Sequence, residues 1–306
     1  MKILSDRDAT IVGRWRSVRK KIIVFISQYH RNKRESNYHK GKLITGLGWR
    51  KLVHPIMLFM LKINKVINRW HLIVNDNREW TGRPTIYACT HVGRYDVEVL
   101  VESIKEHVFI FVGDPNDMYV KPEGFILFLN GQICVDLDYK KDRIIAKERA
   151  IELLIKGGNL MIFPEGAWNI TENQVVMPLF MGTIDMALAS GADIVPIAVT
   201  YSKKNFHVNI GATIRNETIQ KYERTEMNLR LRDTLCSLQW ENWIKNGIWK
   251  RSDIPLNYSK TYIDEIMGEG NIEYTVDDIN RTRYKYEIER EISAIKADLD
   301  RIGHAN

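Results

Sequence analysis

The sequence predicts an α/β fold: a mostly parallel central sheet flanked by helices, with an N-terminal basic amphipathic helical element and a helical C-terminal extension. Its 306 residues, 44% hydrophobic and 27% charged, suit one catalytic-size globular domain with appendages. From Pro84 onward, short apolar runs alternate with helical patterns. Strand–helix repeats of this kind imply a parallel sheet with helices on its faces.

The expected strands, in chain order, are residues 85–90, 108–113, 132–137, 159–163, 194–201 and 206–214. The expected helices between and after them are residues 95–105, 142–156, 179–190 and 222–246. Asp142 is the expected N-cap of its helix, and Gly157-Gly158 provides the stop. Thr275-Val276-Asp277-Asp278 resembles a capping box that opens a last helix. That helix carries an apolar stripe, expected to pack on the body or, alternatively, to form a short coiled seam, made of Ile288, Ile292, Ile295, Leu299 and Ile302.

The charge is unevenly distributed along the chain. Residues 1–75 carry a net charge of +14 and the remainder carries −7, within an overall +7. The basic part is also apolar, with Ile22-Ile23-Val24-Phe25-Ile26 and a stretch over 49–74 that reads as one or two helices. Basic amphipathic helices dock on anionic membrane surfaces. The alternatives are helices that pack on the body with solvated lysines, or a non-catalytic basic protein that binds nucleic acid.

Three segments are expected: a basic amphipathic membrane-docking segment at 1–78, an α/β core at 79–216 and a helical extension at 217–306. The N-terminus lacks the apolar run of a secretory signal, and no uncharged run approaches the ~18 residues of a spanning helix. Cys89, Cys134 and Cys236 lie far apart, which excludes a disulfide scaffold and suits a reducing compartment. We expect a peripheral protein on the cytoplasmic face of a membrane, with an anionic membrane surface as partner and no nucleic acid.

The first motif with chemical content is Thr90-His91-Val92-Gly93-Arg94-Tyr95-Asp96, directly after an expected strand. On one continuous helix, residues five apart differ by about 140° and do not face each other. His91 and Asp96 therefore meet only if a bend at Gly93 separates a loop from the next helix. The carboxylate then fixes one ring nitrogen and leaves the other as a general base. The alternative is a surface histidine beside an ordinary acidic residue at a helix N-terminus.

The second motif, Phe163-Pro164-Glu165-Gly166-Ala167-Trp168-Asn169, also follows an expected strand. In an α/β sheet, ligands bind outside the carboxyl ends of the strands. Glu165 offers a carboxylate and Gly166 an unencumbered backbone N–H, either of which can orient a hydroxylated acceptor or help to hold an oxyanion. The alternative is a turn without chemistry.

Together these motifs resemble the glycerolipid, or lysophospholipid, acyltransferase family, whose pattern is His, four residues and Asp, followed by a Phe-Pro-Glu-Gly block. Two weaker blocks and a connecting segment are also similar to the family, at residues 131–136, 194–199 and 177–183. The resemblance covers residues 45–215. It implies an α/β acyltransferase with His91 and Asp96 as catalytic residues. It also implies substrate binding by Pro164, Glu165 and Gly166, together with Gly93 and Arg94 of the first motif.

The resemblance implies direct transfer of a fatty acyl group to a hydroxyl. His91, oriented by Asp96, takes the hydroxyl proton, and the oxygen attacks the thioester of acyl-CoA or acyl carrier protein. No nucleophilic Ser or Cys and no cofactor is required, and Cys89 reads as a buried inert thiol. The scattered histidines contain no metal-binding pattern. The default acceptor is a lysophospholipid, 1-acylglycerol 3-phosphate, and acyl carrier protein is a further expected partner.

The sequence departs from the family where arginines are associated with the acceptor's phosphate. These positions hold Leu137 and Trp168, neither of which can bind phosphate bidentately. The missing charge can come from elsewhere, with candidates Arg94, Lys121, Lys140, Lys141 and Arg143. Alternatively the acceptor has no phosphate beside its hydroxyl, as in a glycolipid or saccharide on which Trp168 can stack.

Overall fold

A computed structural model gives the structure of the chain and describes residues 6–42, 44, 46–113, 122–136, 139–171, 174–202, 204–245, 251–254, 256–257, 261, 264 and 276–286. Within these residues one sheet has the strand order β1-β7-β6-β2-β5-β3-β4. The strands are β1 (His71–Asp76), β2 (Thr85–Cys89), β3 (Val108–Gly113), β4 (Gln132–Val135), β5 (Asn159–Ile162), β6 (Asp193–Ser202) and β7 (Asn205–Ile210).

The sheet is mostly parallel, as predicted. The β6–β7 pair is antiparallel, and the other neighbouring pairs are parallel. Each of the six expected strands begins within one residue of its predicted start. The last one is shorter than expected and ends at Ile210, while Ile214 forms only an isolated bridge with Ile194.

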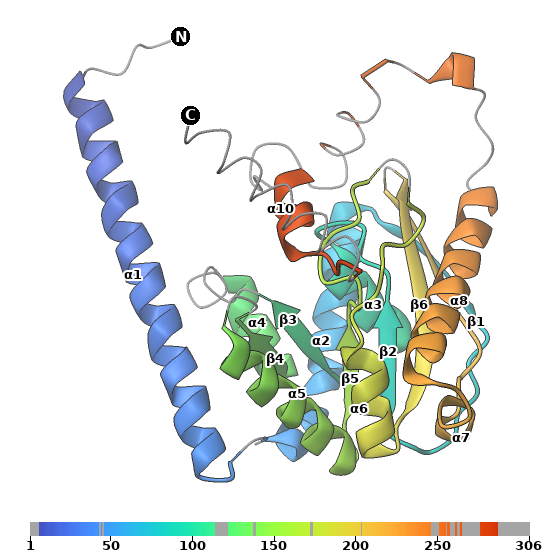
Figure 1. The fold of residues 1–306 in the computed structure, drawn as a ribbon. Helices are drawn as coiled ribbons and strands as arrows, with labels where there is room; N and C mark the ends of the chain where they lie inside the picture. The colour runs from blue at the N-terminus through green and yellow to red at the C-terminus, as the bar shows by residue number, and fades with distance from the viewer. Residues whose placement is uncertain are drawn as a thin grey trace, which may run out of the picture.

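Helices cover both faces of the sheet, which makes a three-layer α/β architecture (Figure 1). On one face, α5 (Lys140–Ile155), α6 (Gly182–Ser190) and α8 (Arg224–Lys245) bury an apolar cluster against the strands. On the other face, α3 (Asp96–Ile104) and part of α2 (Leu47–Asn68) pack on a second cluster. Further helical elements are α1 (Asp6–His39), α4 (Pro122–Asn130), α7 (Asn216–Ile219), η1 (Arg251–Asp253) and α10 (Val276–Thr282).

The expectation of helix through Val74 is wrong for its last residues. Helix α2 ends where Arg69 adopts a left-handed conformation with φ of 56°. The chain then enters β1, an edge strand that pairs in parallel with β7. Within the run 71–76 four side chains are exposed and two, Leu72 and Asn75, are half-buried, which fits an edge strand. Helical periodicity upstream obscured this strand in the sequence. The expected docking segment 1–78 therefore contributes a strand to the sheet.

Two details at other helix ends also differ from expectation. Helix α5 begins at Lys140, so Asp142 lies in its first turn and is not its N-cap. The Asp142 carboxylate is instead buried, where it accepts hydrogen bonds from Arg34 and from the backbone N–H of Asp136. The last helix, α10, ends at Thr282, and the expected stripe from Ile288 to Ile302 lies outside the described residues.

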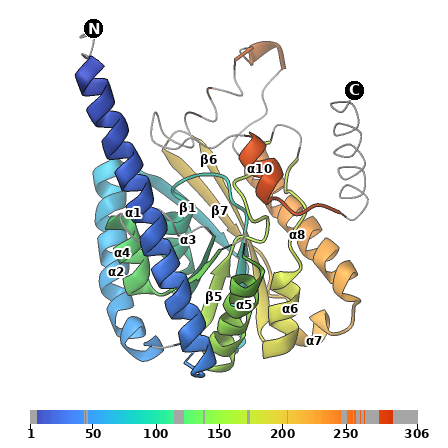
Figure 2. The ribbon, with the colours of Figure 1, turned by 60° about the vertical axis from the view of Figure 1, so that its left-hand side comes forward.

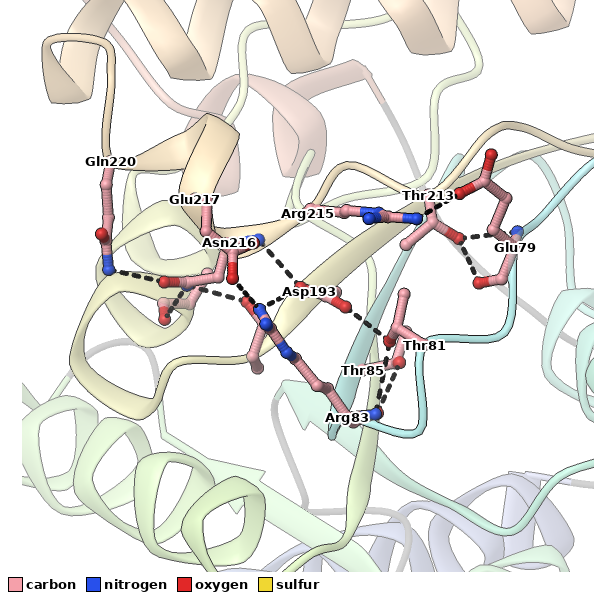
Figure 3. A network of polar contacts seen from close by, with 12 residues as sticks. Glu79, Thr81, Arg83, Thr85, Asp193, Thr213, Arg215, Asn216, Glu217 and Gln220 are labelled. Carbon is pink, nitrogen blue, oxygen red and sulfur yellow. Dashed lines mark hydrogen bonds and ion pairs between the residues drawn. The ribbon is translucent and has the colours of Figure 1, made fainter.

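A buried polar network fixes the amino end of the sheet (Figure 3). Asp193, fully buried at the start of β6, accepts a hydrogen bond from the Thr81 hydroxyl at 2.6 Å. Its other oxygen accepts from the backbone N–H of Asn216 at 2.8 Å and lies 3.8 Å from the Arg83 guanidinium. The network joins the segment before β2 to the start of α7. The opposite, carboxyl end of β2 and β5 carries the two sequence motifs.

The two N-terminal helices are long: α1 has 34 residues and α2 has 22. Helix α1 stands beside α4 and α5 (Figures 1 and 2). None of the helices in the described ranges is both long enough and apolar enough to cross a bilayer.

Candidate active site

His91 and Asp96 meet as the first motif predicts. His91 lies on the loop after β2, and Asp96 is the first residue of α3. The Nδ1 atom of His91 lies 2.8 Å from Oδ2 of Asp96. That oxygen also accepts the backbone N–H groups of Val92 at 2.7 Å and Gly93 at 2.9 Å. The Asp96 carboxylate is thus held by the loop that it closes, and only 2% of the residue is exposed.

The bend between the two residues needs no left-handed glycine. The chain bends at Gly93, as the motif predicts, and Gly93 is absent from the positive-φ glycines found among the described residues. The hydrogen bonds from the N–H groups of Val92 and Gly93 to Asp96 hold this bend. Gly93 is buried, and its N–H donates to the Asp96 carboxylate. This N–H therefore stabilises the loop and is not a free donor.

The imidazole of His91 is fixed on two sides. Its ring stacks on the Phe163 ring, with centroids 3.9 Å apart and an interplanar angle of 16°. The Trp168 ring lies 5.3 Å away at a tilt of 49°. The backbone carbonyl of His91 accepts the N–H of Asn169 at 2.7 Å. The Nε2 atom has no hydrogen-bond partner within the described part of the chain, and 19% of the side chain is exposed. One ring nitrogen is therefore oriented and the other is available.

Glu165 joins the two motifs from inside the protein. One carboxylate oxygen accepts the backbone N–H of His91 at 3.2 Å, and the other accepts that of Met177 at 2.7 Å. The residue is 0% exposed, and this burial raises the pKa of its carboxyl to about 8. Both carboxylate oxygens of Glu165 thus face backbone N–H groups in this structure, and its contact with an acceptor stays a prediction. Glu165 holds the backbone of His91 in position through the hydrogen bond from its N–H.

Gly166 and Pro164 also build the loop. The N–H of Gly166 donates to the carbonyl of Phe163 at 3.0 Å, so it is not the unencumbered donor that the motif predicted. Gly166 has φ of +71°, and a Cβ there would lie 2.5 Å from the Phe180 ring. Only glycine satisfies both constraints. Pro164 is buried, and its carbonyl accepts the N–H of Phe180 at 2.8 Å.

The described candidates for phosphate-binding cations lie on two elements: Arg94 is on the loop before α3, and Lys140, Lys141 and Arg143 are on α5. Arg94 is exposed on the catalytic loop, with its guanidinium carbon 4.8 Å from the centroid of the Tyr95 ring. Lys141 forms an ion pair with Glu35 of α1. Lys121 and Leu137 lie outside the described residues. Of these candidates, Arg94 is the one closest in sequence to His91.

Cys89 lies two residues before His91, at the end of β2. Cys89 is fully buried, as predicted, and burial raises the pKa of its thiol well above the usual value. Among the described residues, no group of three or more His, Cys, Asp or Glu side chains is arranged to hold a metal ion.

Sequence reasoning missed the residues that hold the second motif from a distance. The Asn169 amide donates to the carbonyls of Gln174 and Val175 and so closes the loop after Glu165. From α8, the Arg232 guanidinium donates twice to the carbonyl of Val176, at 3.1 and 2.8 Å. Asn169 lies inside the motif and is of a type that pairs with backbone groups. Arg232 carries no local signal, because its partner lies 56 residues earlier in the chain.

Known proteins place this geometry in context. A sequence model of the family described as Acyltransferase matches residues 71–200. No curated protein sequence matches the chain significantly. Among solved structures, the 1-acyl-sn-glycerophosphate (LPA) acyltransferase PlsC from Thermotoga maritima is similar, with 13% identity and a TM-score of 0.54. The match covers 76% of this chain and 97% of that chain, and at this identity the similarity concerns the fold.

Proposed function

Since this chain belongs to the glycerolipid acyltransferase family through residues 71–200 and is an O-acyltransferase, we propose that it acylates a hydroxyl of a lysophospholipid-like acceptor. The donor is an acyl thioester, either acyl-CoA or acyl carrier protein. The default acceptor is 1-acylglycerol 3-phosphate. The observation that carries the proposal is the 2.8 Å contact between His91 Nδ1 and Asp96, which leaves Nε2 of the ring for an acceptor hydroxyl.

The proposed reaction has one bond-forming step and no covalent enzyme intermediate. Nε2 of His91 removes the hydroxyl proton while the acceptor oxygen attacks the thioester carbonyl. The new C–O bond forms, the C–S bond breaks, and the departing thiolate takes the proton from the imidazolium. Asp96 accepts a hydrogen bond from Nδ1–H and stabilises the charged ring in the meantime. The stacked ring of Phe163 restricts rotation of the imidazole, so less orientation has to be fixed on substrate binding.

The acceptor assignment has two candidates, each with its own observation. The PlsC neighbour is named for acylation of a phosphate-bearing acceptor, and exposed Arg94 offers a cation on the catalytic loop. Against this, the tilted Trp168 ring lies 5.3 Å from His91, where the family resemblance leads one to expect an arginine. An indole provides an apolar stacking surface without charge. This favours, as second candidate, an acceptor without phosphate beside the hydroxyl, such as a glycolipid or saccharide.

Peripheral binding to an anionic membrane, on its cytoplasmic face, completes the proposal. Helix α2 exposes an apolar stripe at three- and four-residue steps, made of Trp49, Leu52, Ile56, Phe59, Met60, Ile63, Val66 and Ile67. Three of its cations contact the body, because Arg50 donates to the carbonyl of Phe128, Lys51 donates to that of Gly157, and Lys65 pairs with Glu102. Lys62 and Arg69 remain exposed near the stripe. An apolar face with flanking cations is typical of interfacial helices, whereas nucleic acid would gain little from the apolar side chains.

The test uses the purified full-length protein, a labelled long-chain acyl thioester and a total lipid extract. The species that gains the acyl group is identified by mass. His91→Ala should abolish transfer while thermal unfolding and vesicle binding stay unchanged. The matched control is His71→Ala, which alters an exposed histidine on edge strand β1. Undiminished transfer by His91→Ala would overturn the catalytic assignment.

A further inference from the structure

We propose that the C-terminal segment 276–286 is a positioning element of the active site, acting on the loop of Glu165 through Ile279 and Tyr284. The proposal rests on the acyltransferase function set out above. This segment lies far beyond the residues 71–200 that match the family. It nevertheless returns to the carboxyl end of the sheet, where α10 lies over the loop that follows β5 (Figures 1 and 2).

Ile279 makes the first contact between α10 and this loop. It is 1% exposed and belongs to an apolar cluster with Ala167, Ile170 and Met177. Trp168 packs against the same cluster and also flanks the imidazole of His91. The backbone N–H of Met177 donates to Glu165, whose other oxygen accepts the N–H of His91. Ile279 is therefore connected to His91 through one apolar cluster and the buried carboxylate of Glu165.

Tyr284 makes a second contact, a few residues further on. Its ring meets the Phe180 ring edge-on, with centroids 5.6 Å apart and an interplanar angle of 76°. Phe180 lies against Gly166, where it leaves no room for a Cβ, and its N–H donates to Pro164. Tyr284 therefore covers the aromatic ring that shapes the Pro164–Gly166 turn.

The dependence runs in both directions. A helix as short as α10, seven residues, does not form by itself in water, so it depends on burial of Ile279 for its structure. In return, Ile279 closes the side of the loop that carries Met177 and Trp168. Removing that packing should loosen the loop and shift the backbone of His91. A misplacement of about 1 Å at reacting groups can cost on the order of a hundredfold in rate.

The experiment compares Ile279→Ala and Tyr284→Ala with the wild-type chain. The control, Asp277→Ala, changes an exposed residue of the same helix. The first readout is hydrogen–deuterium exchange of the peptides that span residues 165–180. The second is the division of the activity loss between kcat and the KM for the thioester. We expect faster exchange in both variants and a fall in kcat of about tenfold or more for Ile279→Ala, with little change in KM. Ile279→Leu should restore both values, and Asp277→Ala should match wild type.

The outcomes separate this proposal from the proposed function. Exchange is measured without turnover, so wild-type protein that transfers no acyl group overturns the function and still leaves the packing role tested. Unchanged exchange over 165–180 with unchanged kcat in both alanine variants overturns the positioning role. If Ile279→Ala does not fold, the half-buried Tyr284→Ala and the single-methyl deletion Ile279→Val decide the result.

Discussion

At the scale of single residues, one oxygen of Asp96 accepts three hydrogen bonds, from His91 Nδ1 and from the N–H groups of Val92 and Gly93. Asp96→Asn keeps the size of the side chain and one carbonyl oxygen. That oxygen can still hold the two backbone groups, so the loop should remain folded. The negative charge that stabilises the imidazolium is lost, and kcat should fall by about two to four orders of magnitude. The assay is steady-state acyl transfer alongside thermal unfolding. Wild-type kcat in a folded Asp96→Asn protein would contradict the orienting role.

Glu165 should make stability depend on pH. Its pKa is raised from 4.5 to about 8 by burial, so the folded protein keeps a proton that the unfolded chain releases. The favourable contribution is complete below about pH 4.5 and is lost as pH rises toward 8. Glu165→Gln removes this titration, so its unfolding free energy should vary less between pH 5 and 8 than that of the wild type. The wild-type slope from this group is about 1.4 kcal/mol per pH unit at most. Urea unfolding at four pH values measures the difference, and parallel curves would refute the buried proton.

Trp168 gives a direct test of acceptor choice. Trp168→Arg introduces the planar cation that binds phosphate bidentately. If the natural acceptor lacks phosphate, this change should lower its use and raise the relative kcat/KM for 1-acylglycerol 3-phosphate by about tenfold or more. Trp168→Phe keeps an aromatic surface and serves as the matched control. Competition between the two acceptors in one reaction reports the ratio. A ratio that does not change in Trp168→Arg would exclude this residue from acceptor recognition.

At the scale of elements, α1 is anchored to the body by a charged contact that the sequence did not indicate. The Arg34 guanidinium donates to both oxygens of the Asp142 carboxylate, at 3.1 and 2.6 Å. Asp142 is buried, and Arg31 adds a second contact by pairing with Asp136 at 3.0 Å. The loop between β4 and α5 is thus tied to the basic N-terminal helix.

Breaking this anchor should be costly. Arg34→Met leaves the buried Asp142 carboxylate without its cation, which should lower the unfolding free energy by about 3–5 kcal/mol. Lys141→Met removes an exposed pair with Glu35 on the same pair of helices and should change stability little. Urea unfolding of the three proteins measures both effects. Equal losses of unfolding free energy in the two variants would contradict the idea that burial strengthens the Arg34 contact.

The elements themselves divide by how local their signals are. The starts of strands β2 to β7 were predictable because apolar runs and turn residues mark them in the sequence. Strand β1 was not, because it follows α2 after only two residues and pairs with β7, more than 130 positions away. Helix α4 was missed because its run Phe125-Ile126-Leu127-Phe128-Leu129 is apolar without a polar face. The N-cap assignment of Asp142 failed because Arg34, a distant partner, sets its position.

At the scale of the whole molecule, the same distinction applies to the site. The contact between His91 and Asp96 follows from spacing, since five residues and a strand end leave one arrangement in which they meet. The role of Glu165 does not follow, because its partners, His91 and Met177, come from loops that only the folded sheet brings together. The contribution of α10 depends on a chain return of about a hundred residues and has no trace in either motif.

The apolar stripe of α2 is exposed, and no other described part of the chain covers it. Leu52 is 80% exposed and Phe59 is 64% exposed, although the opposite side of the helix packs on α3 and α4. A bilayer interface would bury these side chains, and each buried aromatic or leucine contributes about 1.5–3 kcal/mol. Phe59→Glu should therefore weaken binding to anionic vesicles by about tenfold or more.

The control for this prediction is Leu229→Glu, which places the same charge at an exposed position on α8, away from the stripe. Co-sedimentation with vesicles of mixed neutral and anionic lipid, at low and high salt, measures both variants. Salt should weaken the wild-type interaction through Lys62 and Arg69 without abolishing it, because the apolar contribution is not screened. Acyl transfer to a water-soluble acceptor should be unaffected in Phe59→Glu, whereas transfer to an acceptor embedded in vesicles should fall with binding. Equal vesicle binding by Phe59→Glu and wild type would mean that the stripe faces something other than lipid.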